Sequence, residues 1–425
     1  MTGRPALCHD ADAITAGWMQ QALAEGGAPG LPAIRDVAVE DLGSATNAFG
    51  RLLRCHLTTD GGAPAAPARV IVKLPTADPT ALRFARWLSM HERECLFYRR
   101  VAPRARIRSP ALLYGDFDED THRFVLVLED LRDLDLEVPA RHAGVEAGRA
   151  RRAVREIAGL HGQFWGEVDH PALSGCPDVL GPKYARFLQI AYLVCLPVVL
   201  ERFGDCFSGE TRRLVEALGP KIGAHFAAVA AGPRTFVHRD YRGENMFFRA
   251  GDDVGAVANA GPVAGARDGA GDDFAVIDWQ GCGLGAGLYD VAYFLGANVD
   301  TDDRRRVERE ALGEYHDVVC RLGAEGFTFD DCWRGYRQNM LGVLVPLVLG
   351  AGGLDLDDHR LRDLVRSGLG RTLAAVEDLD AGAFIPADGG FLSADYCLST
   401  LSRCAYRMYD VARRVRGRSA GDSRR

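Results

Sequence analysis

One segment in the second half of the chain constrains the fold most, because polar residues stand at the ends of its short apolar runs. The runs are 235–237, 246–248 and 274–277. Short runs of this kind, bounded by polar residues, are typical of strands. Asp240 comes shortly after the first run and Asp278 directly after the third. With the loop between the last two runs left aside, the two acids flank a short hairpin, so we expect both carboxylates to face one cleft.

The spacing of the polar residues indicates a specific chemistry. His238-Arg-Asp240-x-x-x-x-Asn245 matches the H-R-D-x-x-x-x-N catalytic loop of protein kinases. In such a loop the aspartate accepts a hydroxyl proton, and the asparagine five residues later holds a metal ion on the phosphates. Asp278 stands where the metal-binding aspartate of D-F-G would stand, with Trp and Gln in place of Phe and Gly. Alone, Asp278 would be read as a turn acid that closes a strand.

Lys73 ends a Val-Ile-Val-Lys run that resembles the V-A-I-K strand, whose lysine grips the nucleotide phosphates. It is one of only three lysines in a chain with 51 basic residues. The alternative is a solvated residue at a strand edge. The following helix offers Glu92 and Glu94 as ion-pair partners. We favour Glu94, because Phe97 and Tyr98 lie three and four residues further on, along one face that can pack on the sheet.

Two further segments are candidates for nucleotide contact. Gly43, Ser44 and Asn47 lie between the first two predicted strands and offer main-chain and side-chain donors to a phosphate. A plain hairpin turn would have much the same sequence. Glu129 and Leu131 end the predicted sheet, where the hinge of a two-lobed kinase pairs its main chain with adenine. This second assignment rests on the order of the elements alone.

The coarse pattern predicts an α+β protein with two lobes. Strands are expected at 37–42, 51–58, 69–74, 111–114 and 124–128, with one helix at 80–101. Further helices are expected at 145–165, 184–203, 211–230 and 304–322. We therefore expect a nucleotide-binding lobe over 1–131, built on an antiparallel sheet with one helix. Residues 132–425 would form a larger, mainly helical lobe that carries the catalytic residues and the acceptor site.

Two segments differ in composition from the rest. Residues 250–273 consist almost entirely of Ala, Gly, Asp and Val, which is typical of a low-complexity surface loop. Residues 413–425 form a basic tail with no apolar residue after Val415 except one alanine. We interpret this tail as solvated rather than as a nucleic-acid contact.

The order and spacing of the motifs resemble the aminoglycoside phosphotransferase and choline kinase group, and most closely its ecdysteroid-kinase-like branch. The resemblance spans about 37–300. The shared pieces are Glu94-x-x-Phe-Tyr98, Leu128-Glu-Asp-Leu131, Leu160-His161-x-x-Phe-Trp165, His238-x-Asp240-x-x-x-x-Asn245, Ile277-Asp278-Trp-Gln280 and Tyr289-Asp290-Val-Ala-Tyr-Phe294.

This resemblance implies a two-lobed, protein-kinase-like fold that uses ATP and Mg²⁺. Asp240 would be the base, Asn245 and Asp278 the Mg²⁺ ligands, and Lys73 with Glu94 the phosphate-gripping pair. It also implies supporting roles, with Asp290 a structural acid under the catalytic loop and His161 a packed helix residue. Arg242 stands where protein kinases carry a lysine that meets the γ-phosphate. Arg239 is a departure, because this group commonly has glycine there.

The kind of acceptor follows from what is missing. A protein kinase has a long activation segment that ends in A-P-E. Here eleven residues separate Asp278 from Asp290, and no A-P-E follows. We therefore expect a small-molecule hydroxyl as the acceptor, in a pocket shaped by about 300–418. Four aromatic residues either line this pocket or, as we favour, pack in the core: Trp333, Tyr336, Tyr396 and Tyr406.

Composition narrows the class further. The net charge of −7 argues against a duplex nucleic-acid binder. The most apolar segment, 191–200, is expected to be too short to span a bilayer, and it contains Pro197. Eleven cysteines without a C-x-x-C pair indicate free thiols, and we expect a soluble, cytoplasmic protein. The oligomeric state stays open. The alternatives are an inactive nucleotide- or ligand-binding module on the same fold and an antibiotic-resistance phosphotransferase.

Overall fold

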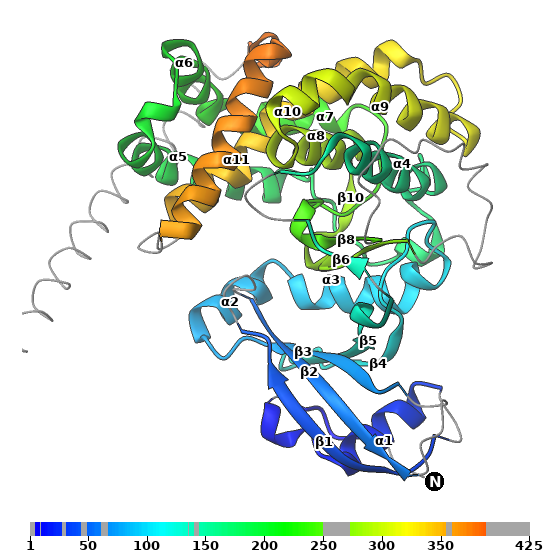
Figure 1. The fold of residues 1–425 in the computed structure, drawn as a ribbon. Helices are drawn as coiled ribbons and strands as arrows, with labels where there is room; N and C mark the ends of the chain where they lie inside the picture. The colour runs from blue at the N-terminus through cyan, green and yellow to red at the C-terminus, as the bar shows by residue number, and fades with distance from the viewer. Residues whose placement is uncertain are drawn as a thin grey trace, which may run out of the picture.

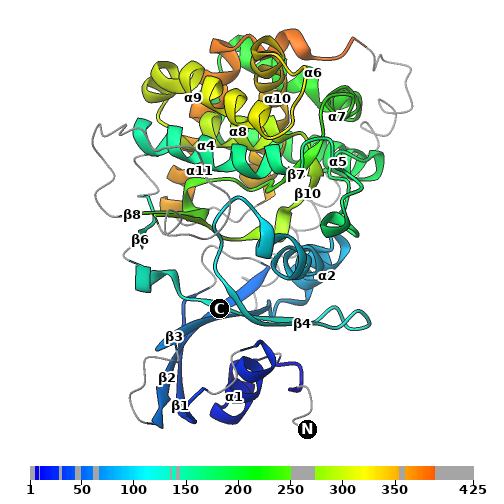
Figure 2. The same cartoon turned by 90° about the vertical axis from the view of Figure 1, so that its right-hand side faces the viewer.

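The chain folds into a sheet-containing N-terminal lobe and a larger helical C-terminal lobe, as the computed structural model shows in Figures 1 and 2. The structure describes residues 5–8, 10–27, 31–43, 49–60, 67–134, 136–139, 144–249, 273–353 and 359–387. The predicted fold class is confirmed: the arrangement is α+β, two-lobed and kinase-like.

Five strands form the sheet of the N-terminal lobe: β1 (Ile34–Asp41), β2 (Gly50–Thr59), β3 (Arg69–Pro75), β4 (Leu112–Phe117) and β5 (Phe124–Glu129). Their order is β1-β2-β3-β5-β4, and every neighbouring pair is antiparallel. The predicted hairpin of β2 and β3 is present, with Leu52 opposite Lys73. A helix that the sequence analysis did not predict, α1 (Ala16–Glu25), lies beside this sheet.

The central strands β3 and β5 are buried on both faces of the sheet, whereas the edge strand β1 is mostly exposed. In β5, Val125 and Val127 pack in the cluster that includes α1. Their neighbours Phe124, Leu126 and Leu128 pack in the large cluster shared with the C-terminal lobe. Because successive side chains of a strand point to opposite faces, β5 connects two cores.

The predicted helix over 80–101 is broken into shorter pieces. They are α2 (Pro79–Trp87), α3 (Met90–Leu96) and a π-helical turn at Phe97–Val101. The break falls at Ser89, whose φ of 52° lies in the left-handed region. A residue in that conformation cannot continue a right-handed helix. The expectation of one helix was therefore wrong, although the segment is helical on both sides of the break.

The C-terminal lobe contains small sheets and long helices. The strands are β6 (Leu136–Glu137), β7 (Thr235–Val237), β8 (Met246–Arg249), β9 (Phe274–Val276) and β10 (Gly283–Gly285). The helices are α4 (Ala147–Gln163), α5 (Pro182–Arg202), α6 (Gly209–Leu218), α7 (Ile222–Ala230), α8 (Gly287–Asn298), α9 (Thr301–Arg321), α10 (Phe329–Gly353) and α11 (His359–Asp378). β8 and β9 form the predicted antiparallel hairpin, and β7 pairs with β10.

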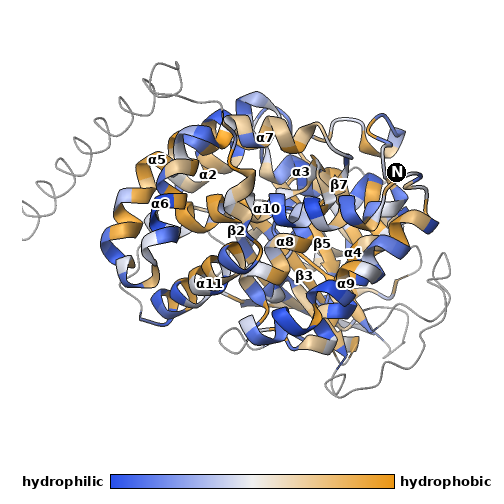
Figure 3. Ribbon diagram, turned by 90° about the horizontal axis from the view of Figure 1, so that it is seen from above, coloured by the Kyte–Doolittle hydropathy of each residue, from blue (hydrophilic) through white to orange (hydrophobic). Residues whose placement is uncertain are grey.

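Helix α8 is the centre of this lobe, because almost all its residues are buried. It contacts α4, α9, α10 and α11. Figure 3 shows the contrast between the mostly hydrophobic α8 and the largely hydrophilic outer helix α9. The segment between β7 and β8 lies against this buried helix, because Asp290 of α8 accepts hydrogen bonds from the main-chain N–H groups of His238 and Arg239.

Two other expectations about helices need correction. The predicted helix over 211–230 is split at Gly219–Lys221, where Pro220 has no N–H for a helical hydrogen bond.

The apolar segment 191–200 belongs to the longer helix α5, which by length and composition alone could cross a membrane. The expectation that it is too short was wrong. Its contacts with α7 and α10 are those of a core helix.

Several predictions concern residues outside the described ranges. They include most of the loop over 250–273, the basic tail over 413–425, and the aromatic residues Tyr396 and Tyr406. Tyr336 is fully buried and donates its hydroxyl to Glu308 at 2.9 Å, as expected for core packing. Nine cysteines lie in the described part of the chain, and all nine are free thiols.

Candidate active site

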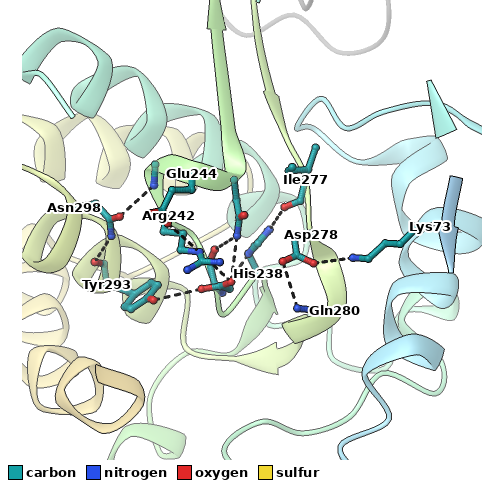
Figure 4. A network of polar contacts seen from close by, with 12 residues as sticks. Lys73, His238, Arg242, Glu244, Ile277, Asp278, Gln280, Tyr293 and Asn298 are labelled. Atoms are coloured by element: carbon teal, nitrogen blue, oxygen red, sulfur yellow. Dashed lines mark hydrogen bonds and ion pairs between the residues drawn. The ribbon is translucent and has the colours of Figure 1, made fainter. Parts of the chain in front are cut away.

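Lys73 lies between the two lobes, where the alternation of β3 places it. Val72 and Leu74 face the core around α1, so the Lys73 side chain points the other way, toward α3. Its ammonium contacts Glu94 of α3 at 2.8 Å and Asp278 of the C-terminal lobe at 2.9 Å. Figure 4 shows Lys73 reaching Asp278 from the N-terminal side. One cation therefore joins the sheet, helix α3 and the hairpin of the other lobe.

Burial makes these three charges depend on one another, since Lys73 is 4% exposed. Burial alone would lower the pKa of Lys73, but the charges of Asp278 and Glu94 raise it. Burial also raises the pKa of Glu94, and the charge of Asp278 adds to this effect. Burial would raise the pKa of Asp278 too, but Lys73, Arg242 and His238 lower it. Asp278 is thus held as a carboxylate beside a permanent cation.

The backbone at Asp278 is set by its surroundings. Its φ of 66° is left-handed, which is uncommon for a residue other than glycine. The next residue, Trp279, is fully buried and stacks on Phe97 with 3.7 Å between ring centroids. Gln280 donates its amide N–H to Asp278 Oδ2 at 3.3 Å. The buried indole therefore anchors the turn that directs the Asp278 carboxylate toward Lys73.

Asp240 lies on the other side of the same site, with its carboxylate held by three groups. Tyr293 of α8 donates its hydroxyl to Oδ1 at 3.3 Å. Asn245 donates its amide N–H to Oδ2 at 3.2 Å and to the Asp240 carbonyl oxygen at 2.9 Å. The guanidinium of Arg242 lies 3.3 Å from Oδ2. The side chain remains 28% exposed, so a ligand in the cleft can still reach it.

Arg242 makes a second ion pair, with Glu244 at 3.4 Å. The charge of Asp240 is the largest influence on it and raises its pKa, with Glu244 adding to that effect. The structure places Arg242 beside Asp240, whereas the sequence analysis considered only a contact of Arg242 with the γ-phosphate. Its guanidinium contacts two carboxylates there, so a contact with a phosphate would compete with these ion pairs.

A fully buried carboxylate, Asp290 of α8, supports the loop from below. It accepts hydrogen bonds from the main-chain N–H groups of His238 at 2.7 Å and Arg239 at 2.8 Å. It also contacts His161 Nε2 at 3.2 Å. The positions of Asp290 and His161 agree with what the resemblance implies for both. The loop geometry therefore depends on a helix that is itself immobilised by packing.

The residues present fit a magnesium ion by their donor chemistry. Mg²⁺ binds through oxygen atoms and commonly uses one or two carboxylates together with substrate phosphates. Asp278 offers a carboxylate, and Asn245 offers its amide oxygen because its amide nitrogen is bonded to Asp240. Asp278 and Glu94 also bring two carboxylates to the one ammonium of Lys73. No group of three or more His, Cys, Asp or Glu among the described residues could hold a metal without substrate.

The structure describes only some of the other residues that were predicted to contact the nucleotide. The N–H of Gly43 donates to Asp41 Oδ1 at 2.9 Å, while Ser44 and Asn47 lie outside the described residues. The side chain of Glu129 pairs with Arg108 at 2.9 Å, and its main-chain N–H donates to a carbonyl of the sheet. A contact with adenine would therefore come from other main-chain groups between Glu129 and Leu131. The side chain of Leu131 is buried.

Sequence reasoning missed two residues of the site. Tyr293 holds Asp240, and its signal was available because it follows Asp290 by three residues on one helix face. His91 donates from Nε2 to the carbonyl oxygen of Phe49, at the end of the first loop. Burial lowers the pKa of His91 to about 4, so it is neutral near pH 7. A lone histidine in a helix gives no such signal in the sequence.

The fold and the site together define a two-lobed protein of the kinase-like class. No protein-family model and no curated protein matches the chain. Solved structures are similar to it at low identity. They include an aminoglycoside phosphotransferase candidate from Ralstonia eutropha, with 14% identity, 87% of this chain and 99% of that chain covered, and a TM-score of 0.48.

Two small-molecule kinases show similar values. A microcompartment-associated aminopropanol kinase has 15% identity, covers 89% of this chain and 98% of that chain, and has a TM-score of 0.47. An ethanolamine kinase from Plasmodium vivax has 11% identity, with 80% of this chain and 82% of that chain covered, and a TM-score of 0.42.

Proposed function

We propose that this protein is an ATP- and Mg²⁺-dependent phosphotransferase that transfers the γ-phosphate to a hydroxyl group of a small molecule. The observation that carries this proposal is the ion pair between Lys73 and Asp278, which joins the two lobes beside Asp240 and Asn245. An ion pair that only stabilised the fold would not require a partly exposed carboxylate such as Asp240 beside it. Asp240, at 28% exposure, supplies the group that can accept a proton.

The proposed reaction assigns one role to each residue. The acceptor hydroxyl oxygen bonds to the γ-phosphorus, the bond from that phosphorus to the β–γ bridging oxygen breaks, and ADP leaves. Asp240 takes the hydroxyl proton, and Tyr293 and Asn245 keep its carboxylate in place. Lys73 donates to phosphate oxygens while Glu94 orients it. Asn245 and Asp278 would hold the magnesium ion, which when bound supplies positive charge against the phosphates.

Finer assignments belong to the same proposal. The motifs around Glu94, His161 and Asp290 support the ecdysteroid-kinase-like branch, and the short segment after Asp278 supports a small-molecule acceptor rather than a peptide. The free thiols of the described cysteines support a reducing, cytoplasmic location.

Calorimetric titration of Mg-ATP into two variants tests the proposal. Asp240→Asn should bind Mg-ATP like the wild type, because the base acts on the acceptor. Its phosphoryl transfer should fall by about 10²-fold or more, the usual value of positioned proton acceptance. Asp278→Asn should weaken Mg-ATP binding itself, because it removes the charge that faces the metal.

The matched control is Asp302→Asn, whose side chain is 87% exposed on α9. It should change neither binding nor turnover. If Asp240→Asn lost nucleotide affinity while Asp278→Asn kept it, the two roles would be reversed. If both variants kept full activity in every assay, the kinase proposal would be wrong.

A further inference from the structure

The described part of the chain buries four arginines, and one of them differs from the others. Their exposed fractions range from 1% to 7%. Three pair closely with a carboxylate: Arg54 with Asp130 at 2.6 Å, Arg149 with Glu137 at 2.5 Å and Arg304 with Glu308 at 2.7 Å. The fourth is Arg93 of α3, which has no such ion pair among the described residues. Buried charges are normally paired, so Arg93 calls for an explanation.

A second arginine without a carboxylate partner lies close to the first. Arg239 precedes Asp240 in the catalytic loop, and among the described residues its guanidinium has no ion pair either. The Nε atoms of Arg93 and Arg239 are both buried without a hydrogen-bond partner. Arg93 makes one long bond, from Nη1 to the Gly281 carbonyl at 3.4 Å. Most of its five guanidinium donors are therefore unused.

The two guanidinium groups have one aromatic neighbour in common. Both lie over the ring of Tyr184 in α5, at 5.9 Å for Arg93 and 6.0 Å for Arg239. Arg239 also hydrogen-bonds the Tyr184 side chain and lies 3.7 Å above the ring of Tyr289. Aromatic rings stabilise a cation only modestly. Two cations around one ring repel each other. The charge of the buried Asp290 also acts on Arg239, but among the described residues the two side chains form no ion pair.

The backbone at Arg239 adds a second, independent observation. Its φ is 72°, a left-handed conformation that is strained for a residue with a Cβ atom. Glycine would adopt this conformation without that strain. Asp290 holds the strained loop in place through the N–H groups of His238 and Arg239. This position therefore carries a large cationic side chain, although its backbone conformation favours glycine.

This pair of arginines lies next to the proposed base. Arg239 and Asp240 are consecutive residues, and Tyr289 stacks parallel to Tyr293 at 6.1 Å. Tyr293 in turn donates its hydroxyl to Asp240. Tyr293 and Tyr289 thus link the proposed base to Arg239 through side-chain contacts. A molecule with its hydroxyl at Asp240 would lie beside the residue that carries one of the two cations.

We propose that Arg93 and Arg239 bind an oxyanion, a carboxylate or a phosphate, that belongs to the acceptor itself. The acceptor class is then a small hydroxylated acid, and cationic acceptors such as amino alcohols and polyamine antibiotics are disfavoured by like charge. This inference rests on the proposed function and deepens it. Guanidinium groups suit both oxyanions, because their planar donors match carboxylate and phosphate oxygens.

The first test measures oxyanion binding without any turnover. Thermal unfolding is followed with Mg-ADP present, so that the nucleotide site is filled, while inorganic phosphate or glycolate replaces chloride at constant ionic strength. We expect either oxyanion to raise the unfolding temperature of the wild type. Arg93→Met and Arg239→Gly should lose most of this rise. Arg100→Met, which removes an exposed arginine from the same helical run, should keep it.

The second test distinguishes an oxyanion on the acceptor from a separate one. ADP release is measured with a panel of hydroxy acids, their neutral amides and amino alcohols. We expect kcat/KM to be at least tenfold higher for an acid than for its amide, and Arg239→Gly should abolish this preference mainly through KM. Equal rates for acids and amides, or stimulation of neutral acceptors by free phosphate, would overturn the assignment to the acceptor.

The failure of this inference can be told apart from failure of the proposed function. If Mg-ATP binds and some acceptor is phosphorylated, but neither variant alters its KM or the oxyanion shift, the arginine pair is structural and this inference is wrong. If no acceptor is phosphorylated and Asp278→Asn leaves nucleotide binding unchanged, the proposed function fails instead.

Discussion

Two neighbouring residues of α3 carry opposite charges and are both buried, yet their surroundings differ. Glu94 contacts Lys73, which also contacts Asp278, so its charge belongs to a network that joins both lobes. Arg93 is 7% exposed and has no carboxylate partner among the described residues. In helix α3 the charge of Glu94 is therefore paired with Lys73, whereas Arg93 has no carboxylate partner among the described residues. A network balanced by the chain itself stabilises the fold, whereas an unbalanced charge is available to a ligand.

The strongest test of this contrast removes each cation in turn. Lys73→Met leaves Glu94 and Asp278 buried side by side, and breaking such a buried pair costs about 3–5 kcal/mol of unfolding free energy. Arg93→Met removes a charge that forms no ion pair with a carboxylate in the described part of the chain, so we expect a change within about 1 kcal/mol. Urea unfolding of both variants measures the difference. Equal losses would show that Arg93 stabilises the fold as Lys73 does.

The buried acid under the catalytic loop gives a pH-dependent test. Burial would raise the pKa of Asp290, but the hydrogen bond and charge of His161, with those of His238, lower it. A lowered folded-state pKa adds stability that is present above about pH 4 and is lost as the pH falls through the folded value. Asp290→Asn should cost about 1–3 kcal/mol at pH 7, because buried N–H donors lose their acceptor.

Urea unfolding of the wild type and of Asp290→Asn between pH 7 and pH 3 checks this. The difference between them should shrink below about pH 4, because the unfolded chain then takes up a proton that the folded Asp290, with its lowered pKa, does not yet bind. The exposed acid Asp302 gives the control variant, which should follow the wild type at every pH. A constant difference across the range would mean that the ionised form of Asp290 contributes nothing.

The Lys73–Glu94 pair and Arg93 also show which features of the site can be predicted from the sequence. The pairing of Lys73 with Glu94 was found from the strand ending and the next helix, because strand alternation and helix periodicity are local rules. The β8–β9 hairpin was predicted for the same reason. The isolation of Arg93 could not be found in this way. Burial and the absence of a partner depend on distant residues that only the folded chain brings together.

The errors have the same origin. The helix over 80–101 breaks at Ser89 through the conformation of one residue, which no periodicity reveals. Helix α5 extends beyond its most apolar stretch and packs against α7 and α10. Helix α1 was missed because its few apolar residues gain their burial from the sheet. The burial of α1 and the contacts of α5 come from tertiary packing, which the sequence pattern does not reveal.

A smaller effect is expected when the charge at residue 73 is kept and only its shape is changed. Lys73→Arg retains a cation between Glu94 and Asp278, so the fold should survive. The planar guanidinium is larger than an ammonium and cannot take its place at a crowded phosphate site. We expect turnover to fall by about tenfold or more with little change in urea unfolding. Near-native turnover would remove Lys73 from the site.

The smallest effect is expected in the loop that joins β8 to β9, which belongs neither to the Lys73 network nor to the surroundings of Arg93. Residues 250–273 contain almost only small residues and acids, with few apolar side chains that could anchor them. The two ends of the loop already meet, because the N–H of Arg249 donates to the Asp273 carbonyl at 2.9 Å. A much shorter connection can therefore close the hairpin, and loop length changes the free energy of closure only slowly, by about 0.6 kcal/mol per doubling. Deletion of 251–271 should leave urea unfolding and Mg-ATP binding nearly unchanged, whereas collapse of soluble expression would show that the segment supports the fold.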